Sequence, residues 1–260
     1  MTVLSELTTT DRDTLSSSTH LTLRTQRLPG FQSVAELDSI ATNIYYASIR
    51  IRARIAGSPG AVAGLFTYAD DTDESDIEIL TRDVSSQFRA TNQPTVDASG
   101  NEIPDASTVV PIPAANSKKN ESWTDWIDYR LDWLDGKTEW FVNQKSVQSK
   151  THGVPKKASQ LIMNLWGNGG MWSGNMSVGG AATMDVEWVE MVYNTSGSPG
   201  KREQLGGCKT VCNIDGVKSV GFPEAASSAT ALGPWQSRSE GYHLGILWIL
   251  IVGYIVSMGI

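Results

Sequence analysis

The chain has 260 residues, of which 40 % are hydrophobic, so it is long enough to bury a large core in one or two domains. Its formal net charge is −7 and no run of Lys and Arg forms a basic stripe, which argues against nucleic acid as a partner. Nine Trp and 24 Gly are typical of a β protein that binds flat ligands, although most Trp in any protein belong to the core.

Residues 1–20 are polar and rich in Thr and Ser, so we expect a flexible N-terminal segment. The segment has neither a basic stretch nor an apolar stretch, and it therefore lacks the features of a signal peptide. The first strand-like pattern, HLTLRTQ, follows directly from His20.

Three patterns follow in the next hundred residues. Ile44–Ile55 alternates polar and apolar side chains with a period of two, which predicts a strand that is buried on one face. Gly60–Tyr68 is a continuous apolar run, which predicts a strand that is buried on both faces. Residues 91–120 are rich in Pro, Asn and Ser, and they predict a long loop.

The segment Trp126–Val147 contains two alternating runs joined by an Asp-Gly turn, which predicts a hairpin. Gln160–Gly170 predicts another buried strand that ends in a Gly-rich turn, and Thr183–Asn194 alternates again. No segment before the C-terminal tail has a convincing helical period. Short strands with frequent turns predict an all-β sandwich.

One predicted strand, ESDIEIL from Glu74, carries an acid at every second position. Glu74, Asp76 and Glu78 would share one face of this strand, and the residues between them would face the core. Like charges in a row destabilise a strand, so a fold would tolerate them only where they serve a purpose. A solvated acidic edge or a Ca²⁺ loop would also account for these acids, although an EF-hand pattern is absent.

The spacing of the two Glu residues fits one reaction in particular. Cα atoms four positions apart on a strand are separated by about 13 Å. Two Glu side chains that lean toward each other close most of that distance, and retaining glycoside hydrolysis needs carboxyl groups about 5–5.5 Å apart. Asp76 is shorter and lies between them, so it can orient a Glu and share a proton with it. The crowding should raise the pKa of at least one of the three acids.

The same strand resembles the E-x-D-x-E strand of glycoside hydrolase family 16. Four ordered blocks extend the resemblance to fungal secreted members over roughly residues 21–197: GAVAGLFTYADDTDESDIEILTRD, YRLDWLDGKTEWFVNQKSV, LIMNLWGNGGMWSGN and VEWVEMVYNTSG. The resemblance implies a jelly-roll sandwich of two curved antiparallel sheets, of the concanavalin A-like lectin and glucanase type, with a concave cleft for glycans. It also implies that the sequence lacks the first strand or two of the family fold.

The resemblance further implies roles for the three acids. Glu74 would be the nucleophile, Asp76 its helper and Glu78 the acid/base of an enzyme that hydrolyses β-1,3 or mixed β-1,3/1,4-glucans. We expect no cofactor and no catalytic metal, and a structural Ca²⁺ does not follow from the sequence. Two alternatives remain open: a cell-wall transglycosylase with the same nucleophile, and a non-catalytic lectin-like protein that binds glycans.

Aromatic side chains should line such a cleft, because sugar rings stack on them. Trp166 and Trp172 flank the GNGG turn and are the first candidates, and Tyr68 and Trp123 are the next. For each Trp, a place in the core is the competing interpretation.

Two kinds of modification are also predicted. Cys208 and Cys212 are too widely spaced for a CxxC redox pair and have no His nearby, so they form either a small local disulfide or two unrelated thiols. Sequons at Asn120, Asn175 and Asn194 favour a secreted glycoprotein, although single sequons arise by chance.

Residues 198–243 are rich in Gly, Ser and Ala and resemble a stalk, which leads to a hydrophobic tail at residues 244–260. The 17 uncharged residues of the tail predict a hydrophobic helix that is directed to a membrane rather than a core helix. The tail is either a single span or a signal for a GPI anchor, for which Ser228 to Ala231 are candidate attachment positions. We expect a monomer on the outer cell surface, and therefore a signal peptide that is missing from this sequence.

Overall fold

The computed structural model describes residues 20–114, 121–196, 212–213 and 224–225. Within residues 20–196 the described chain forms twelve strands and no helix. The short strands β13 (Cys212–Asn213) and β14 (Glu224–Ala225) pair with each other and belong to a separate unit. The predicted helix at residues 244–260 and the segment 1–19 lie outside the described residues.

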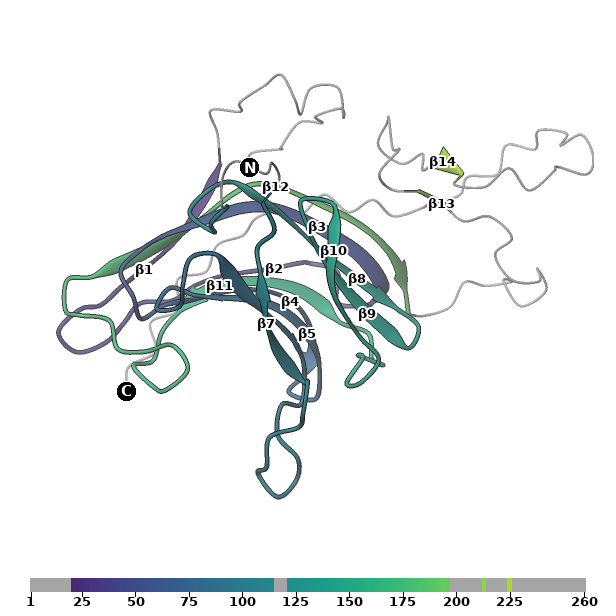
Figure 1. The fold of residues 1–260 in the computed structure, drawn as a ribbon, viewed down its shortest axis with the longest axis horizontal. Coiled ribbons are helices and arrows are strands. Elements are labelled where there is room, and N and C mark those ends of the chain that lie inside the picture. The colour runs from purple at the N-terminus through teal and green to yellow at the C-terminus, as the bar shows by residue number, and fades with distance from the viewer. Residues whose placement is uncertain (1–19, 115–120, 197–211, 214–223, 226–260) are drawn as a thin grey trace, which may run out of the picture. The chain divides into compact units, whose positions relative to one another are not determined.

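The twelve strands form two six-stranded sheets in which every pairing is antiparallel. The first sheet contains, in spatial order, β1 (Leu21–Gln26), β12 (Ala181–Thr195), β3 (Ile44–Gly57), β8 (Ile127–Leu134), β9 (Lys137–Val142) and β10 (Lys145–Lys150). The second sheet contains β2 (Ala35–Asp38), β11 (Gln160–Trp166), β4 (Val62–Asp70), β5 (Asp73–Leu80), β6 (Gln87–Asn92) and β7 (Ser107–Pro111). Figure 1 shows the two sheets layered on each other and curved in the same direction, which confirms the predicted sandwich.

The hydrophobic core lies between the sheets and follows the alternation of the sequence. On β3, Ile49, Ile51 and Ile55 are at most 3 % exposed, while the Arg residues between them lie on the other face. The largest fully buried side chains of the core include Trp133 and Trp140. The predicted hairpin is also confirmed, since β8 and β9 pair across a turn in which Gly136 has a φ of +68°.

Two predictions about strands need correction. Residues 91–120 do not form one long loop, because β7 pairs with β6 at the edge of the second sheet. An edge strand needs a partner on one side only and tolerates Pro, so its composition resembles that of a loop. The run Gly60–Tyr68 is buried on both faces only at its start, because Phe66 and Tyr68 are partly exposed.

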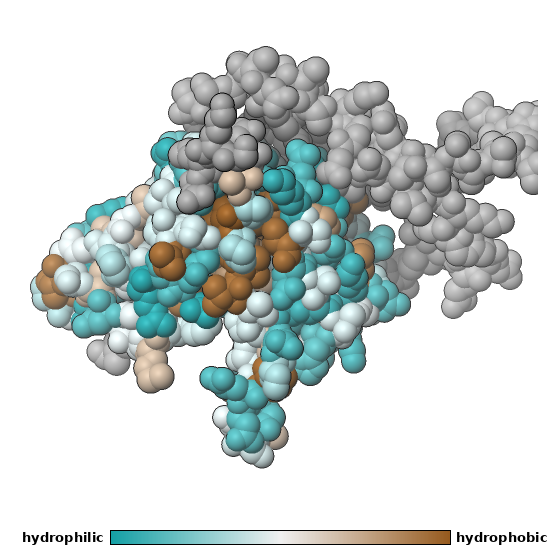
Figure 2. Space-filling view, in the orientation of Figure 1, coloured by the Kyte–Doolittle hydropathy of each residue, from teal (hydrophilic) through white to brown (hydrophobic). Residues whose placement is uncertain are grey.

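The true loop between β6 and β7 covers residues 93–106 and projects from the sandwich (Figure 1). It is stiffened by its own backbone, in which Ile103 donates a hydrogen bond to the Thr95 carbonyl and Asp97 to the Asn101 carbonyl. Figure 2 shows this projection as a mostly hydrophilic lobe with one hydrophobic spot. One side of the loop therefore forms a firm wall beside the second sheet.

Candidate active site

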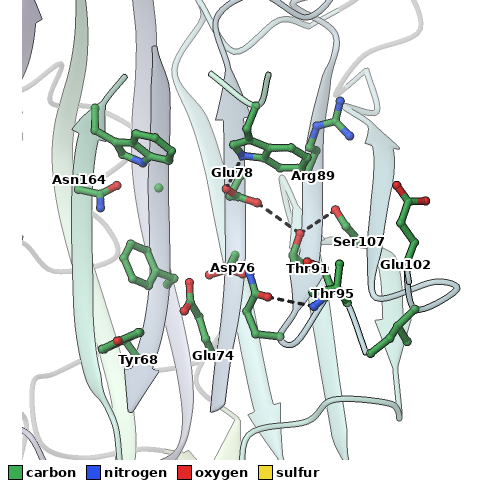
Figure 3. Close-up of a pocket in the computed structure, with 17 residues that line it drawn as sticks. Tyr68, Glu74, Asp76, Glu78, Arg89, Thr91, Thr95, Glu102, Ser107 and Asn164 are labelled. Atoms are coloured by element: carbon green, nitrogen blue, oxygen red, sulfur yellow. Dashed lines mark hydrogen bonds between the residues drawn. The ribbon is translucent and has the colours of Figure 1, made fainter. Parts of the chain in front are cut away.

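The three predicted acids lie on β5, in the middle of the second sheet. The residues between them, Ser75 and Ile77, are at most 3 % exposed and face the core. This alternation turns Glu74, Asp76 and Glu78 to the opposite face, where all three line one cavity (Figure 3). The predicted arrangement of the acids on one face is therefore what the structure has.

The cavity has a volume of about 780 Å³ and lies over the concave face of the second sheet. Its floor comes from neighbouring strands in register, so that Glu78 lies opposite Gly64 on β4 and opposite Arg89 on β6. One wall comes from the loop of residues 93–106. The residues that line the cavity are Gly64, Phe66, Tyr68, Glu74, Asp76, Glu78, Arg89, Thr91, Gln93, Thr95, Val96, Glu102, Ile103, Ser107, Asn164, Trp166 and Trp172.

Asp76 is the most buried of the three acids, with 2 % of its surface exposed. Burial raises the pKa of its carboxyl well above the usual value, and the Glu74 charge, a hydrogen bond with Glu74 and the Glu78 charge raise it further. Its backbone carbonyl accepts a hydrogen bond of 2.9 Å from the indole N–H of Trp140, which fixes this part of β5 to the core. A neutral Asp76 can donate its proton in the hydrogen bond to Glu74.

Glu74 has a raised pKa as well. Burial raises the pKa of Glu74 most, the hydrogen bond with Asp76 opposes this, and the charge of Asp71 adds to it. The hydrogen bond stabilises the ionised form of Glu74 in particular, because Asp76 supplies the proton and Glu74 accepts it. A carboxylate with a firm orientation and an oxygen free to react is the arrangement that a nucleophile needs.

Glu78 has the richest set of contacts. The indole N–H of Trp172 donates to Glu78 Oε1 at 3.0 Å, and the Thr91 hydroxyl donates to Oε2 at 3.4 Å. Burial has the largest effect on the pKa of Glu78 and raises it, and the charge of Glu74 also raises it. The hydrogen bonds from Trp172 and Thr91 and the charge of Arg89 lower this pKa. The net shift is upward, which favours a proton on Glu78 and so suits a general acid.

The structure brings three of the four predicted aromatic residues to the cavity. Tyr68, Trp166 and Trp172 line it, and Trp172 is 36 % exposed. Trp123 is the exception, because it is 5 % exposed and packs in the hydrophobic core. We therefore correct the prediction for Trp123: its place is in the core and not in the cleft.

Sequence reasoning missed several residues that share the cavity with the acids. Gly64 and Phe66 could have been found, because they have the same parity as Tyr68 on the predicted strand. Asn164 likewise has the parity of Trp166 on β11. Arg89 could not be predicted as a cavity residue, since the sequence pattern around it did not predict strand β6.

The predicted modification sites are only partly within the described residues. Asn175 and Asn194 are exposed, as an acceptor of a glycan must be, and their glycosylation stays a prediction. Asn120 and Cys208 lie outside the described residues. Cys212 is described only as part of the backbone of β13, so the disulfide also stays a prediction.

The described residues offer neither a metal site nor a membrane-spanning helix. Among them, no group of three or more His, Cys, Asp and Glu could hold a metal ion. Hydrolysis by paired carboxyl groups uses side chains and water, so it requires no cofactor. The described part of the chain also has no helix that is long and apolar enough to cross a membrane, and the tail at 244–260 is not in that part.

Comparison with known proteins agrees with the fold. The family model for glycosyl hydrolases family 16 matches residues 4–190. Since this match covers most of the 260 residues, the chain belongs to glycosyl hydrolases family 16. The resemblance noted in the sequence is thereby confirmed at the level of the family.

The chain is also similar to individual members. It is 28 % identical to the β-glucanase of Paenibacillus macerans over 163 residues, which is 59 % of this chain and 63 % of that protein, so the match spans less than two thirds of the relative. The Bacillus licheniformis β-glucanase structure has a TM-score of 0.51 at 21 % identity, and the match covers 68 % of this chain and 79 % of that one. The Crh5 transglycosylase in complex with NAG has a TM-score of 0.53 at 18 % identity, covering 69 % and 78 %. At these identities the two structures support the fold alone.

Proposed function

We propose that this protein is a retaining glycosidase that hydrolyses β-1,3 or mixed β-1,3/1,4-glucans. The observation that carries the proposal is the placement of Glu74 and Glu78 on one face of β5, with a buried Asp76 between them in a cavity. Glu74 acts as the nucleophile, Glu78 as the acid/base and Asp76 as the residue that orients Glu74.

In the first step, a carboxylate oxygen of Glu74 attacks the anomeric carbon of the bound sugar. The bond from that carbon to the glycosidic oxygen breaks, and the proton of Glu78 passes to the departing oxygen. The raised pKa of Glu78 favours retention of this proton to higher pH than an ordinary Glu allows. The product of the step is a glycosyl ester on Glu74 and an ionised Glu78.

In the second step, Glu78 takes a proton from a water molecule while the water oxygen attacks the anomeric carbon. The ester bond to Glu74 breaks, Glu74 leaves as a carboxylate, and Glu78 is protonated again. Two inversions at the same carbon retain its configuration. Asp76 supports both steps, since its hydrogen bond stabilises the ionised Glu74 that begins and ends the cycle.

The choice of substrate rests on the named relatives and on the cavity. Two of the similar proteins are β-glucanases by name. The cavity combines a strand floor, a loop wall and the aromatic side chains of Trp166, Trp172 and Tyr68, and aromatic rings are suited to packing against neutral sugars. The β-1,3 or mixed β-1,3/1,4 linkage of the substrate is proposed on the same grounds.

A transglycosylase is the second candidate, in which a sugar hydroxyl replaces water in the second step. The observation that favours it is Trp172, which is 36 % exposed, donates to the acid/base Glu78 and follows Met171, which is 93 % exposed. Such an apolar surface could hold an acceptor sugar. A lectin-like role accounts less well for the raised pKa values of all three acids, which suit catalysis.

The test is a product profile over laminarin, lichenan, cellulose and chitin, with the Glu74→Gln protein as the blank. We expect shorter oligosaccharides from laminarin or lichenan, and none from the blank. Lengthening of an oligosaccharide added as an acceptor would instead identify a transglycosylase. Binding to laminarin without release of reducing sugar would support the lectin-like role, and cleavage by the blank would refute the assignment of Glu74.

We also propose that the protein is a monomer attached to the outer cell surface, with residues 244–260 acting either as a single span or as the signal for a GPI anchor. The support is the uncharged tail and the proposed substrate, which lies outside the cell. The test is expression behind a signal peptide and treatment of the cells with phosphatidylinositol-specific phospholipase. Release supports a GPI anchor, retention with an intact C-terminal epitope supports a span, and secretion with the tail attached contradicts both.

A further inference from the structure

Three side chains outside the catalytic acids form a connected set next to Glu78. We call Asp83, Arg89 and Trp172 the Arg89 array. Arg89 Nη2 lies 2.9 Å from Asp83 Oδ2, and the Arg89 guanidinium carbon lies 4.8 Å from the centre of the Trp172 ring. The Trp172 N–H in turn donates to Glu78, so a continuous chain of contacts joins Asp83 to the acid/base.

The side chain of Trp172 takes part in two of these contacts. It belongs to the turn after β11, where it is 36 % exposed and its neighbour Met171 is 93 % exposed. Within the described residues, its polar and ring contacts are those with Glu78 and Arg89. A cation over an indole face is attractive, and the planar guanidinium of Arg suits this contact better than the ammonium of Lys.

Arg89 itself is well fixed. It lies on β6 directly opposite Glu78 in the register of the sheet, and its side chain lines the cavity (Figure 3). Asp83, which holds it, follows β5 in a turn where its backbone N–H donates to the Leu80 carbonyl at 2.9 Å. The array therefore ties Trp172 to the two strands that carry Glu78 and its cross-strand neighbour.

We propose that Arg89 is a positioning residue for Glu78: it holds Trp172 so that the indole N–H stays on the carboxyl group of the acid/base. This inference rests on the proposed function for the role of Glu78. The alternative is that Trp172 is only a platform for a sugar and that the pair of Arg89 with Asp83 only stabilises the fold.

The Arg89 array also affects the protonation of Glu78. The groups that act on its carboxyl are Arg89 and Thr91 from β6, Trp172 from the turn after β11, and Glu74 from β5 itself. Asp76 also lies on β5 next to Glu78, and Glu102 lines the same cavity from the loop. Of these, Trp172, Thr91 and Arg89 lower the pKa, so the loss of Arg89 or of the indole N–H should raise it further.

The test uses three variants of the full chain and one matched control. Arg89→Gln removes the charge and the stacking, Arg89→Lys keeps the charge, and Trp172→Phe keeps a ring but removes the N–H. Arg54→Gln is the control, because Arg54 also stacks on a Trp, at 4.6 Å from Trp126, and pairs with an acid, Asp185 at 2.9 Å, but does so on the first sheet. Circular dichroism first establishes that each variant folds.

The first readout compares two substrates that differ in their need for an acid. The first substrate is laminarin or lichenan, whichever the wild type cleaves. On it we expect Arg89→Gln to lower kcat/KM about tenfold. This loss is smaller than the roughly 100-fold or more that a positioned acid contributes in all, because Glu78 itself remains. On a 2,4-dinitrophenyl β-glucan oligosaccharide, whose leaving group needs no proton, we expect a loss of less than about threefold. A purely structural role would lower both equally, and a sugar platform would mainly raise KM.

The second readout is the pH dependence, in activity and in the free protein. We expect the alkaline limb of kcat/KM to move to higher pH in Arg89→Gln and in Trp172→Phe, with Arg89→Lys between Arg89→Gln and the wild type. The carboxyl carbon of Glu78, identified by its loss in Glu78→Gln, should titrate at correspondingly higher pH in ¹³C NMR. The control Arg54→Gln should match the wild type in every readout.

The outcomes separate this proposal from the proposed function. If the wild type cleaves no glucan, the proposed function fails, whereas the NMR titration still reports on the array. If the wild type is active but Glu78 titrates unchanged in both Arg89→Gln and Trp172→Phe, Arg89 is not a positioning residue. If Arg89→Gln does not fold, Trp172→Phe and Arg89→Lys decide by the same readouts.

Discussion

Asp76 carries a carboxyl group that the fold buries almost completely, although burial disfavours its charged form. It is 2 % exposed, its Oδ2 has no hydrogen-bond partner among the described residues, and its pKa is raised by burial above all. Sequence spacing predicted that crowding would raise the pKa of at least one acid. In the structure the pKa values of all three acids are raised, and burial is the largest cause each time.

The raised pKa of Asp76 makes the stability of the protein depend on pH. A carboxyl whose pKa is higher in the folded state adds stability below its unfolded pKa of about 3.9, and this contribution is lost as pH rises through the folded value. Asn cannot ionise, so Asp76→Asn avoids the loss. We therefore expect the melting temperature of Asp76→Asn, measured relative to that of the wild type, to rise from pH 5 to pH 9. The corresponding gain in the free energy of unfolding is about 1 kcal/mol or more. A difference that stays constant or falls with pH would contradict this expectation.

The catalytic acids lead to a second expectation at the scale of single residues. Glu74→Gln should reduce kcat on a β-glucan by at least about 1,000-fold while the fold stays intact, because the amide cannot form the glycosyl ester. Glu190→Gln is the matched control, since Glu190 lies on β12 and pairs with Arg50 at 3.6 Å on the first sheet. Near-normal turnover by Glu74→Gln, measured as release of reducing sugar, would show that Glu74 is not the nucleophile.

At the scale of the strand, the sequence predicts those strands in which polar and apolar side chains alternate. The period of two in Ile44–Ile55 and in β5 is visible because one face is apolar and the other polar. The same rule fails at β7, whose edge position relaxes its composition, and at Trp123, since size and aromaticity do not distinguish a core Trp from a cleft Trp. Arg89 was missed because its role depends on a cross-strand partner that local pattern does not reveal.

Gly64 gives an expectation for the floor of the cleft. A Cβ at this position would come within 2.6 Å of Asn164 Oδ1 and 3.1 Å of the Phe66 ring, and Gly64 lies opposite Glu78. We expect Gly64→Ala to displace these side chains and to lower kcat/KM on the β-glucan by about tenfold. Gly30→Ala serves as the control, since nothing lies within 4 Å of its Cβ. Equal activity in the two variants would show that the floor needs no glycine.

At the scale of the whole molecule, the hydrophobic core and the cavity that the described residues form both lie within residues 20–196. The core residues run from Leu23 to Met191, and the cavity uses residues between Gly64 and Trp172. We therefore expect a fragment of residues 20–196 to unfold in one cooperative transition and to keep kcat within about twofold of the full chain. A fragment that shows no thermal transition would mean that the remaining residues contribute to the fold.

The central claim is that Glu74 and Glu78 act together in a double displacement, and the most direct test is the configuration of the first product. The two acids share one face of β5 in the same cavity, and we expect their carboxyl groups to approach to about 5–5.5 Å, the separation in a retaining enzyme, which leaves no room for the water that an inverting enzyme places between them. Proton NMR can follow the anomeric signals during the first minutes of hydrolysis of a β-glucan oligosaccharide. We expect the β-anomer to appear first and the α-anomer to follow only by mutarotation. An α-anomer as the first-formed product would contradict the double displacement.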